Sequence, residues 1–241
     1  MRGVLLTAVV LWYNWFIYYI CVMIESQKYI DRRHRVMDKI ANRSNIDDKV
    51  IEAMKRVPRQ MFVDSHLKEM AYYDRPLPIA AGQTISQIYT VAIQTNLLDL
   101  DEGTSVLEIG TGCGYQTAVL CEMGYFVYSI ERHEELYLTA KQNLETLGYN
   151  ALLFHGDGFE GLPKYAPFDG VLITCGAPDV PEELINQLAL NGNMVAPIGR
   201  GVQEMTVIQK VNEGEYKTTK KGAYKFVPML PGKVDKPIDD N

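Results

Sequence analysis

Short apolar runs alternate with longer stretches of helical spacing in the second half of the chain, and this pattern predicts a parallel β-sheet with helices packed on it. It starts at residue 105 and is typical of repeated β-α-β units. The predicted strands are Ser105–Ile109, Phe126–Ile130, Ala151–His155, Gly170–Thr174 and Met194–Pro197. The predicted helices between them are Tyr115–Glu122, Glu134–Thr146 and Pro181–Leu188. We therefore predict an α/β fold with a doubly wound, mostly parallel sheet.

A different pattern follows Gly199 and predicts two antiparallel strands. The runs Met205–Val211 and Glu215–Lys220 flank the turn-forming residues 212–214. A short turn between two such runs is typical of a β-hairpin. We expect this hairpin to extend the sheet at one edge.

Upstream of the sheet, residues 31–70 predict a small helical lead-in. Asp47 or Asp48 is suited to begin a helix as its N-cap, and Pro58 is expected to end that helix. Its apolar face is predicted to comprise Val50, Ile51, Met54 and Val57. The periodicity then disappears over residues 74–87, where proline and glycine become frequent, and this predicts a long ordered loop.

The chain opens on an uncharged apolar run. Residues 3–24 carry no charged side chain, and a helix of that length spans a bilayer. Basic residues crowd the segment 28–39, so the positive-inside rule would keep everything after the span in the cytoplasm. A cleaved signal peptide fits less well, because no small-residue cleavage pattern follows. The alternative is a later start of translation, at Met23 or Met37.

Composition and charge exclude several classes of function. The 241 residues carry a formal net charge of -6, which gives no basic field for binding nucleic acid. The cysteines and histidines are too scattered to form a disulfide framework or a metal-ligand cluster. These residues are Cys21, Cys113, Cys121 and Cys175, with His34, His66, His133 and His155. We expect one main domain with neither a metal site nor a nucleic-acid partner.

The strongest local signal is a glycine-rich turn between a predicted strand and a predicted helix. Gly110, Gly112 and Gly114 follow the strand at alternate positions. Glycine lets the backbone approach a ligand closely, and the helix that follows offers free N–H groups. The dinucleotide fingerprint requires a glycine where this chain has Tyr115, which disfavours NAD.

Acidic residues near the ends of three predicted strands favour a cationic nucleotide ligand. Glu108 precedes the glycine turn, where it would repel a diphosphate and attract a positive group. S-adenosylmethionine carries an ammonium and a sulfonium and has no phosphate. Glu131, at the next strand end, is placed to accept the ribose hydroxyls. Asp157, between two glycines after the third strand, could accept from the adenine amino group.

Each of these signals has a simpler explanation when taken alone. Glycines at strand ends are commonly plain turns, and Asp157 could cap a helix or stabilise its own turn. Their coincidence at the carboxyl ends of three consecutive strands, where open α/β sheets bind ligands, favours the cofactor site.

Several motifs also occur in a recognisable order. They are VLEIGTGCGYQTAVL at 106–120, YSIER at 128–132, GDG at 156–158 and FDGVLITCGAPDVPEEL at 168–184. The loop adds RPLP at 75–78 and GQTISQ at 82–87, and FVP follows at 226–228. In this order they resemble the protein-L-isoaspartate O-methyltransferases, a family of class I methyltransferases. The resemblance covers residues 31–233 and leaves out the apolar leader at 1–30 and a tail at 234–241.

The resemblance implies a fold and a reaction. The fold would be Rossmann-like, with a seven-stranded sheet whose last strands are antiparallel. The reaction would be methyl transfer from S-adenosylmethionine to the free α-carboxylate of L-isoaspartyl residues in damaged proteins and peptides. The ester closes spontaneously to a succinimide, whose hydrolysis returns some normal aspartyl residues, so the methylation initiates repair. We expect a cytoplasmic monomer, bound to a membrane only if the leader is translated.

The same resemblance assigns roles to individual residues. Ser86 would be the active-site hydroxyl, donating to the acceptor carboxylate. Residues expected to bind the cofactor are Gln83, Thr84, Ile85, Glu108, Gly110, Thr111, Gly112, Cys113, Gly114, Glu131, Asp157 and Gly158. Residues expected to bind the substrate are Ser86, Gln87, Cys175, Gly176 and Ala177. Cys113 and Ile88 depart from the family's usual serine and proline.

Alternatives remain for the site and for the function. From the residues alone, Ser86 could simply be the N-cap of the next helix. Cys175 could be read as a nucleophile, but no histidine has a suggestive spacing, and we interpret it as a lining residue. The chain could instead be a class I methyltransferase for another carboxylate or protein substrate, or a non-catalytic module that binds damaged chains. Retention of Glu108, Glu131, Asp157 and Ser86 argues against the binding module.

Overall fold

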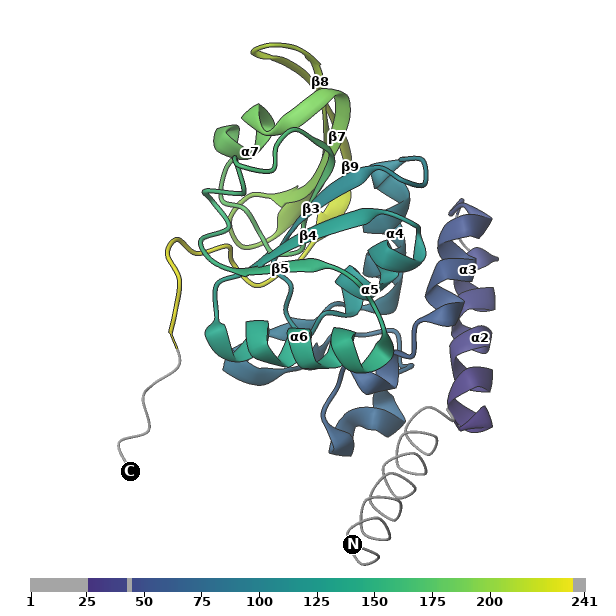
Figure 1. Ribbon diagram of the computed structural model, residues 1–241. Coiled ribbons are helices and arrows are strands. Elements are labelled where there is room, and N and C mark those ends of the chain that lie inside the picture. The colour runs from purple at the N-terminus through teal and green to yellow at the C-terminus, as the bar shows by residue number, and fades with distance from the viewer. Residues whose placement is uncertain (1–25, 43–44, 236–241) are drawn as a thin grey trace, which may run out of the picture.

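A seven-stranded sheet forms the centre of the computed structural model, which describes residues 26–42 and 45–235 (Figure 1). The sheet order is β5-β4-β3-β6-β7-β8-β9. Its strands are β3 (Ser105–Ile109), β4 (Phe126–Glu131), β5 (Leu152–His155), β6 (Phe168–Ile173), β7 (Leu188–Ile198), β8 (Gln203–Asn212) and β9 (Glu215–Tyr224). The first five strands in this order, β5, β4, β3, β6 and β7, pair in parallel. Strand β8 pairs antiparallel with both β7 and β9. The predicted sheet and its terminal hairpin are confirmed.

The helices lie in the order that the sequence predicts. They are α2 (Gln27–Ala41), α3 (Asp48–Arg56), α4 (Ile88–Leu98), α5 (Tyr115–Glu122), α6 (Glu134–Leu147) and α7 (Glu182–Asn186), with 3-10 turns η1 (Arg59–Met61), η2 (Ser65–Met70) and η3 (Ala80–Gly82). The predicted loop at 74–87 is ordered and contains two short paired strands, β1 (Leu77–Pro78) and β2 (Thr84–Ile85).

Two predicted boundaries between α7 and β7 are wrong. The helix expected to reach Leu188 ends at Asn186, because Leu188 already pairs with Phe168 in the sheet. Strand β7 therefore begins six residues before the predicted Met194. Asn191, whose φ is +66°, lies within β7, where the pairing with β6 is irregular.

Both faces of the sheet are covered, and the core is accordingly divided in two. Val106 and Leu172 belong to a cluster with α3, α4 and α5, whereas Leu107 and Val171 belong to a second cluster on the opposite face. Successive strand residues point to opposite faces, which explains why β3 is buried from Val106 to Ile109.

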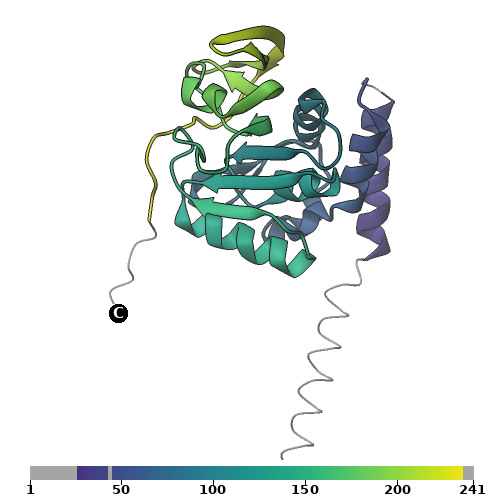
Figure 2. The same ribbon diagram turned by 45° about the horizontal axis from the view of Figure 1, so that its top comes forward.

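The helical lead-in forms as the sequence predicts. The Asp47 carboxylate accepts from the Lys49 N–H at 2.9 Å and caps α3, which ends at Arg56, just before Pro58. The predicted apolar face is buried: Val50, Ile51, Met54 and Val57 are each at most 3% exposed. Figures 1 and 2 show α2 and α3 side by side.

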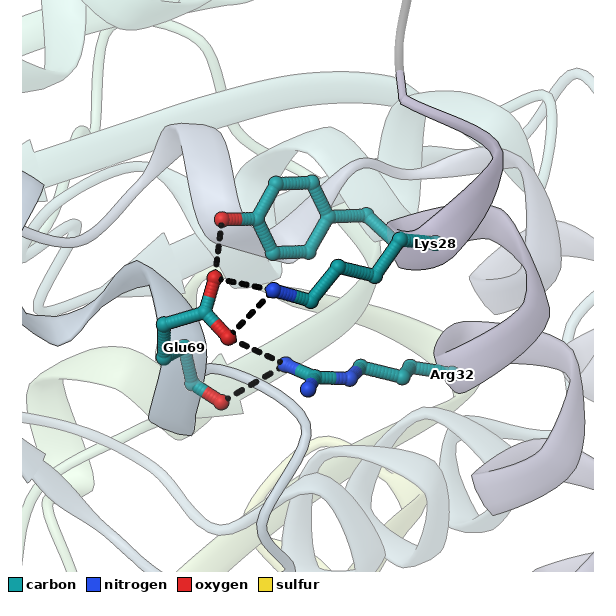
Figure 3. A network of polar contacts seen from close by, with 4 residues as sticks. Lys28, Arg32 and Glu69 are labelled. Carbon is teal, nitrogen blue, oxygen red and sulfur yellow. Dashed lines mark hydrogen bonds and ion pairs between the residues drawn. The ribbon is translucent and has the colours of Figure 1, made fainter.

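A polar network fastens α2 to η2 (Figure 3). The Glu69 carboxylate accepts from Lys28 Nζ at 2.6 Å, from Arg32 Nη1 at 3.0 Å and from the Tyr29 hydroxyl at 3.0 Å. The Lys28 ammonium, together with the Tyr29 hydroxyl, lowers the pKa of Glu69 to about 2. The network thus ties the first helix of the lead-in to its last turn. Within the described residues no helix is both long and apolar enough to cross a membrane, and the apolar run at 3–24 lies outside them.

Candidate active site

A cavity lies at the carboxyl ends of β3, β4 and β6. The strand order reverses between β3 and β6, and open α/β sheets bind ligands at such a reversal. We call it the cofactor cavity. Its walls include Gln83, Thr84, Gly110, Gly112, Glu131, Arg132, His133, Gly158, Thr174, Cys175 and the segment 227–230.

The glycine turn forms the floor of this cavity. Gly110 has a φ of +95°, Gly112 of +57° and Gly114 of +91°, values that favour glycine. At Gly110 a Cβ atom would lie 2.6 Å from Thr174 Oγ1, a separation that side chains do not tolerate. The backbone therefore approaches its neighbours as closely as the sequence predicts, and residue 110 must be glycine.

Glu131 lies beside the glycine turn, at the end of β4. Its Oε2 accepts from the Gly112 N–H and its Oε1 from the His133 N–H, both at 2.9 Å. These bonds fix the carboxylate against the cavity wall. A carboxylate has about four acceptor sites, so Glu131 can still accept hydrogen bonds from hydroxyl groups in the cavity.

Glu108 lies beneath the glycine turn and not in the cavity wall, where we expected it to meet the ligand. Its side chain is 0% exposed and does not line the cavity. Its Oε2 accepts from the Thr117 hydroxyl at 2.5 Å and the Ser129 hydroxyl at 2.7 Å, and Ser129 in turn contacts Thr111. The Glu108 carboxyl is thus linked to the glycine turn through the hydroxyl groups of Ser129 and Thr111. The sequence misses this because Glu108 alternates to the face of β3 that α5 covers.

This burial predicts a pH-dependent stability. Burial raises the pKa of Glu108 from 4.5 to about 7 in the folded chain. Between these values the folded state keeps a proton that the unfolded state releases, so stability falls as pH rises, by at most about 1.4 kcal/mol per pH unit. We expect the Glu108→Gln variant to gain stability relative to the unaltered chain between pH 5 and pH 8. Urea unfolding of both chains at pH 5 and at pH 8 measures this. A difference in unfolding free energy between the two chains that is the same at both pH values would contradict it.

Asp157 stabilises its own turn and also holds the C-terminal segment. Its Oδ1 accepts from the Phe159 N–H at 2.9 Å, which is the turn role left open by the sequence. Its Oδ2 accepts from the Gly232 N–H at 2.5 Å. Asp157 lies just outside the lining, whereas its neighbour Gly158 is part of it.

A C-terminal segment, of which the sequence analysis noted only the FVP motif at 226–228, closes the cofactor cavity. We call residues 227–234 the strap, and four of them, Val227 to Leu230, line the cavity. Arg132 donates to the Pro231 carbonyl at 3.2 Å and the Gly232 carbonyl at 3.1 Å. The YSIER motif contained this arginine, but its partners are a hundred residues away in sequence, so no local pattern reveals them.

The strap also changes the interpretation of two predicted substrate residues. The Gly176 N–H donates to the Val227 carbonyl, and the Met229 N–H to the Gly176 carbonyl, both at 2.8 Å. Ala177 bridges to Ile198 and is 0% exposed. Neither residue lines the cofactor cavity or its neighbour. Gly176 thus anchors the strap, whereas Ala177 is bound to the end of β7.

A second cavity opens beside the first, and we call it the acceptor cavity. It is lined by Ser86 and Gln87 just before α4, by Tyr89 in the first turn of α4, and by residues 221–227. Thr84, Thr174 and Val227 line both cavities. A group held in one cavity can therefore meet a group held in the other at these three residues.

Ser86 is not the helix cap that it could be from sequence alone. The N-cap position of α4 is Gln87, and the Asp74 carboxylate accepts from the Tyr89 N–H at 2.9 Å. Within the described chain no protein group hydrogen-bonds to the Ser86 hydroxyl. That hydroxyl is therefore available to a ligand in the acceptor cavity.

Arg59 holds the backbone of Ser86 from the interior. Its guanidinium is 0% exposed, lies 4.7 Å from the centre of the Tyr115 ring and donates to the Ser86 carbonyl at 2.7 Å and the Ala71 carbonyl at 2.8 Å. Burial lowers the pKa of this group. Arginine was not among the expected site residues, because its partners come from other elements.

The cysteines near the cavities are inert. Burial, reinforced by the Glu131 charge, raises the pKa of Cys175 to about 12, and burial raises that of Cys113 to about 11. Neither thiol is a nucleophile near neutral pH. Cys175 lines the cofactor cavity, as expected, but the side chains of Ile85, Thr111 and Cys113 are buried behind it.

Comparison with known proteins decides which chemistry this arrangement serves. The family model described as "Protein-L-isoaspartate(D-aspartate) O-methyltransferase (PCMT)" matches residues 31–234. The chain belongs to this family. A protein-L-isoaspartate O-methyltransferase of Christiangramia forsetii is 45% identical over 88% of this chain and 100% of its own length. One of Cytophaga hutchinsonii is 46% identical over 82% of this chain and 90% of its own.

Solved structures agree with this membership. A structure titled protein-L-isoaspartate O-methyltransferase superposes with a TM-score of 0.75 at 28% identity, covering 81% of this chain and 65% of that one. One from Plasmodium falciparum, described as a complex with S-adenosyl-L-homocysteine, has a TM-score of 0.72 at 23% identity and covers 82% of this chain and 98% of that one. The Rossmann-like methyltransferase fold is thereby shown, and the chain is an S-adenosylmethionine-dependent methyltransferase.

Proposed function

We propose that this methyltransferase transfers a methyl group to the free α-carboxylate of L-isoaspartyl residues in proteins and peptides and so initiates their repair. The observation that carries the proposal is the junction of the two cavities at Thr84, Thr174 and Val227. A cofactor site and an acceptor site that share a wall are what direct group transfer requires. Membership of the family supplies the substrate class.

The cofactor cavity suits S-adenosylmethionine. Its glycines at 110, 112 and 158 keep side chains out of the space, and at Gly158 a Cβ would lie 2.5 Å from Ile109. Glu131 has the acceptor capacity for the ribose hydroxyls, and its charge would repel a diphosphate held beside the glycine turn. When bound, S-adenosylmethionine supplies a methyl group activated by its sulfonium. Gln83 and Thr84 would cover it beside the acceptor cavity.

The acceptor chemistry explains why the junction contains no base. A carboxylate is already ionised at neutral pH, so no proton has to be removed before it attacks. The Ser86 hydroxyl would donate to one oxygen of this carboxylate and orient the other oxygen toward the junction. Positioning of this kind is worth about 7–11 kcal/mol in favourable intramolecular reactions. Arg59 keeps the serine in place through its backbone.

We further propose that the enzyme acts as a cytoplasmic monomer. The basic residues of α2, which begins just after the apolar run, support cytoplasmic placement of the domain by the positive-inside rule. The acidic net charge of -6 supports protein and peptide substrates rather than nucleic acid.

Replacement of Ser86 tests the proposed roles. We expect Ser86→Ala to lower kcat/KM for an isoaspartyl peptide about ten- to hundredfold, because a hydrogen bond to a charged group contributes about 1.5–3 kcal/mol. Initial rates of labelled methyl transfer measure this, and titration calorimetry should show unchanged affinity for S-adenosylhomocysteine. Ser65→Ala, on the exposed surface of η2, is the matched control. A Ser86→Ala rate equal to that of the control would contradict the assignment.

A further inference from the structure

The outer wall of the acceptor cavity is basic. It is formed by the end of β9 and the residues that follow, and it includes Lys221 and Lys225. These are the charged members of a lining that is otherwise made of polar, aromatic and small residues, with no carboxylate. Both lysines are exposed. A basic rim is unexpected on a chain whose net charge is -6.

A β-bulge at residues 221–222 of β9 lies in the wall of the acceptor cavity. Between the pairs Thr206–Lys220 and Glu204–Ala223, strand β9 has one residue more than β8. The extra residue lies at Lys221 and Gly222, where φ is +109°, and the Gly222 N–H donates to the Glu204 carboxylate at 2.9 Å. A bulge breaks the alternation of side chains along a strand and redirects one of them. Lys221 is thereby fixed at the rim.

Both lysines lack an ion-pair partner among the described residues. None of the ion pairs among the described residues includes Lys221 or Lys225. Glu204, whose carboxylate accepts from the Gly222 N–H beside the bulge, does not line the acceptor cavity. Lys221 also lines a separate cavity with Asp47 and Asp99, and neither of these carboxylates lines the acceptor cavity. The two charges thus remain available to a bound ligand.

We propose that Lys221 and Lys225 make the enzyme prefer isoaspartyl sites with an acidic side chain next to the isoaspartyl residue. This inference rests on the proposed function. Val227 lies at the junction where the reacting carboxylate is held, and Lys225 is two residues away, which is at most about 7 Å along the chain. Neighbouring residues of an extended peptide are about 3.3 Å apart. A flanking side chain of the substrate therefore reaches the basic rim while its isoaspartyl carboxylate occupies the junction.

Peptides that differ only in the residue after the isoaspartyl position test this preference. The residue would be Glu, Gln or Lys, and kcat/KM would be measured for each by labelled methyl transfer. We expect Glu to exceed Gln by about three- to tenfold at low salt and Lys to fall below Gln, with the differences shrinking as salt rises. In the double variant Lys221→Gln with Lys225→Gln, the ratio of kcat/KM for the Glu peptide to kcat/KM for the Gln peptide should approach one.

The double variant Lys217→Gln with Lys220→Gln is the matched control. It removes the same charge from the same strand at exposed residues that do not line the cavity, so it should keep the preference. An equal loss of preference in both variants would overturn the proposal. The preference would then arise from the summed positive charge of the β8–β9 hairpin and not from the two lysines at the cavity. A ratio near one in the unaltered chain would also overturn it. Failure of the proposed function has a different signature, namely no labelling of any isoaspartyl peptide.

Discussion

Gly110→Ala is expected to weaken binding of S-adenosylhomocysteine at least about a hundredfold, equivalent to about 2.7 kcal/mol. A side chain at a φ of +95° is strained by about 1–2 kcal/mol. The new methyl group would also lie 2.6 Å from Thr174 Oγ1, so Thr174 has to move. Because Thr174 lines both cavities and its hydroxyl contacts the Gly110 carbonyl at 2.6 Å, its movement deforms the floor of the site.

Gly148→Ala separates backbone strain from the effect on the site. Gly148 has a similar φ of +77° at the end of α6, but a Cβ there would meet nothing within 4 Å. Both variants should lose some stability in urea unfolding, whereas only Gly110→Ala should lose cofactor affinity in titration calorimetry. Equal affinities in the two variants would refute the role assigned to the glycine turn.

Arg59→Leu is expected to cost about 2–5 kcal/mol of stability and to slow methyl transfer strongly. The substitution leaves the buried carbonyls of Ala71 and Ser86 without their donor, and each unsatisfied group costs about 1–3 kcal/mol. It also removes the cation from the face of Tyr115. The loop that carries Ser86 should then lose its fixed position relative to the junction.

The measurements for Arg59 distinguish a positioning role from general destabilisation. At a temperature where the variant is folded, kcat/KM for the isoaspartyl peptide should fall while S-adenosylhomocysteine affinity stays close to normal. Arg56→Leu is the control, because Arg56 is half exposed in its ion pair with Glu122 and should contribute less than about 1 kcal/mol. Parallel losses of rate and cofactor affinity in Arg59→Leu would indicate a purely structural role.

The sequence predicts the part of the site that arises from consecutive residues. The glycine turn, Glu131 and Gly158 all follow directly from strands whose apolar runs are plain, and parallel strands bring their ends together. The role of Ser86 in the loop with Gln83 and Thr84 is predicted by resemblance to a family motif, because the local pattern alone favours Ser86 as a helix cap.

The rest of the site depends on contacts between distant segments. The strap reaches the cavity through Arg132, Asp157 and Gly176, and Arg59 reaches Ser86 across 27 residues. Such pairings follow from how the layers pack and leave no periodic signal. Glu108 illustrates the same limit: its position in the motif is evident, but the face of the strand on which it lies is decided by the packing of α5.

Labelled methyl transfer to an isoaspartyl peptide, beside its normal aspartyl twin, tests the central claim most directly. The two peptides differ only in which carboxyl forms the chain, so the acceptor cavity has to distinguish them by position alone. The account predicts a base-labile methyl ester on the isoaspartyl peptide and none on its twin. Equal labelling of both peptides, or of neither while S-adenosylmethionine binds, would contradict it.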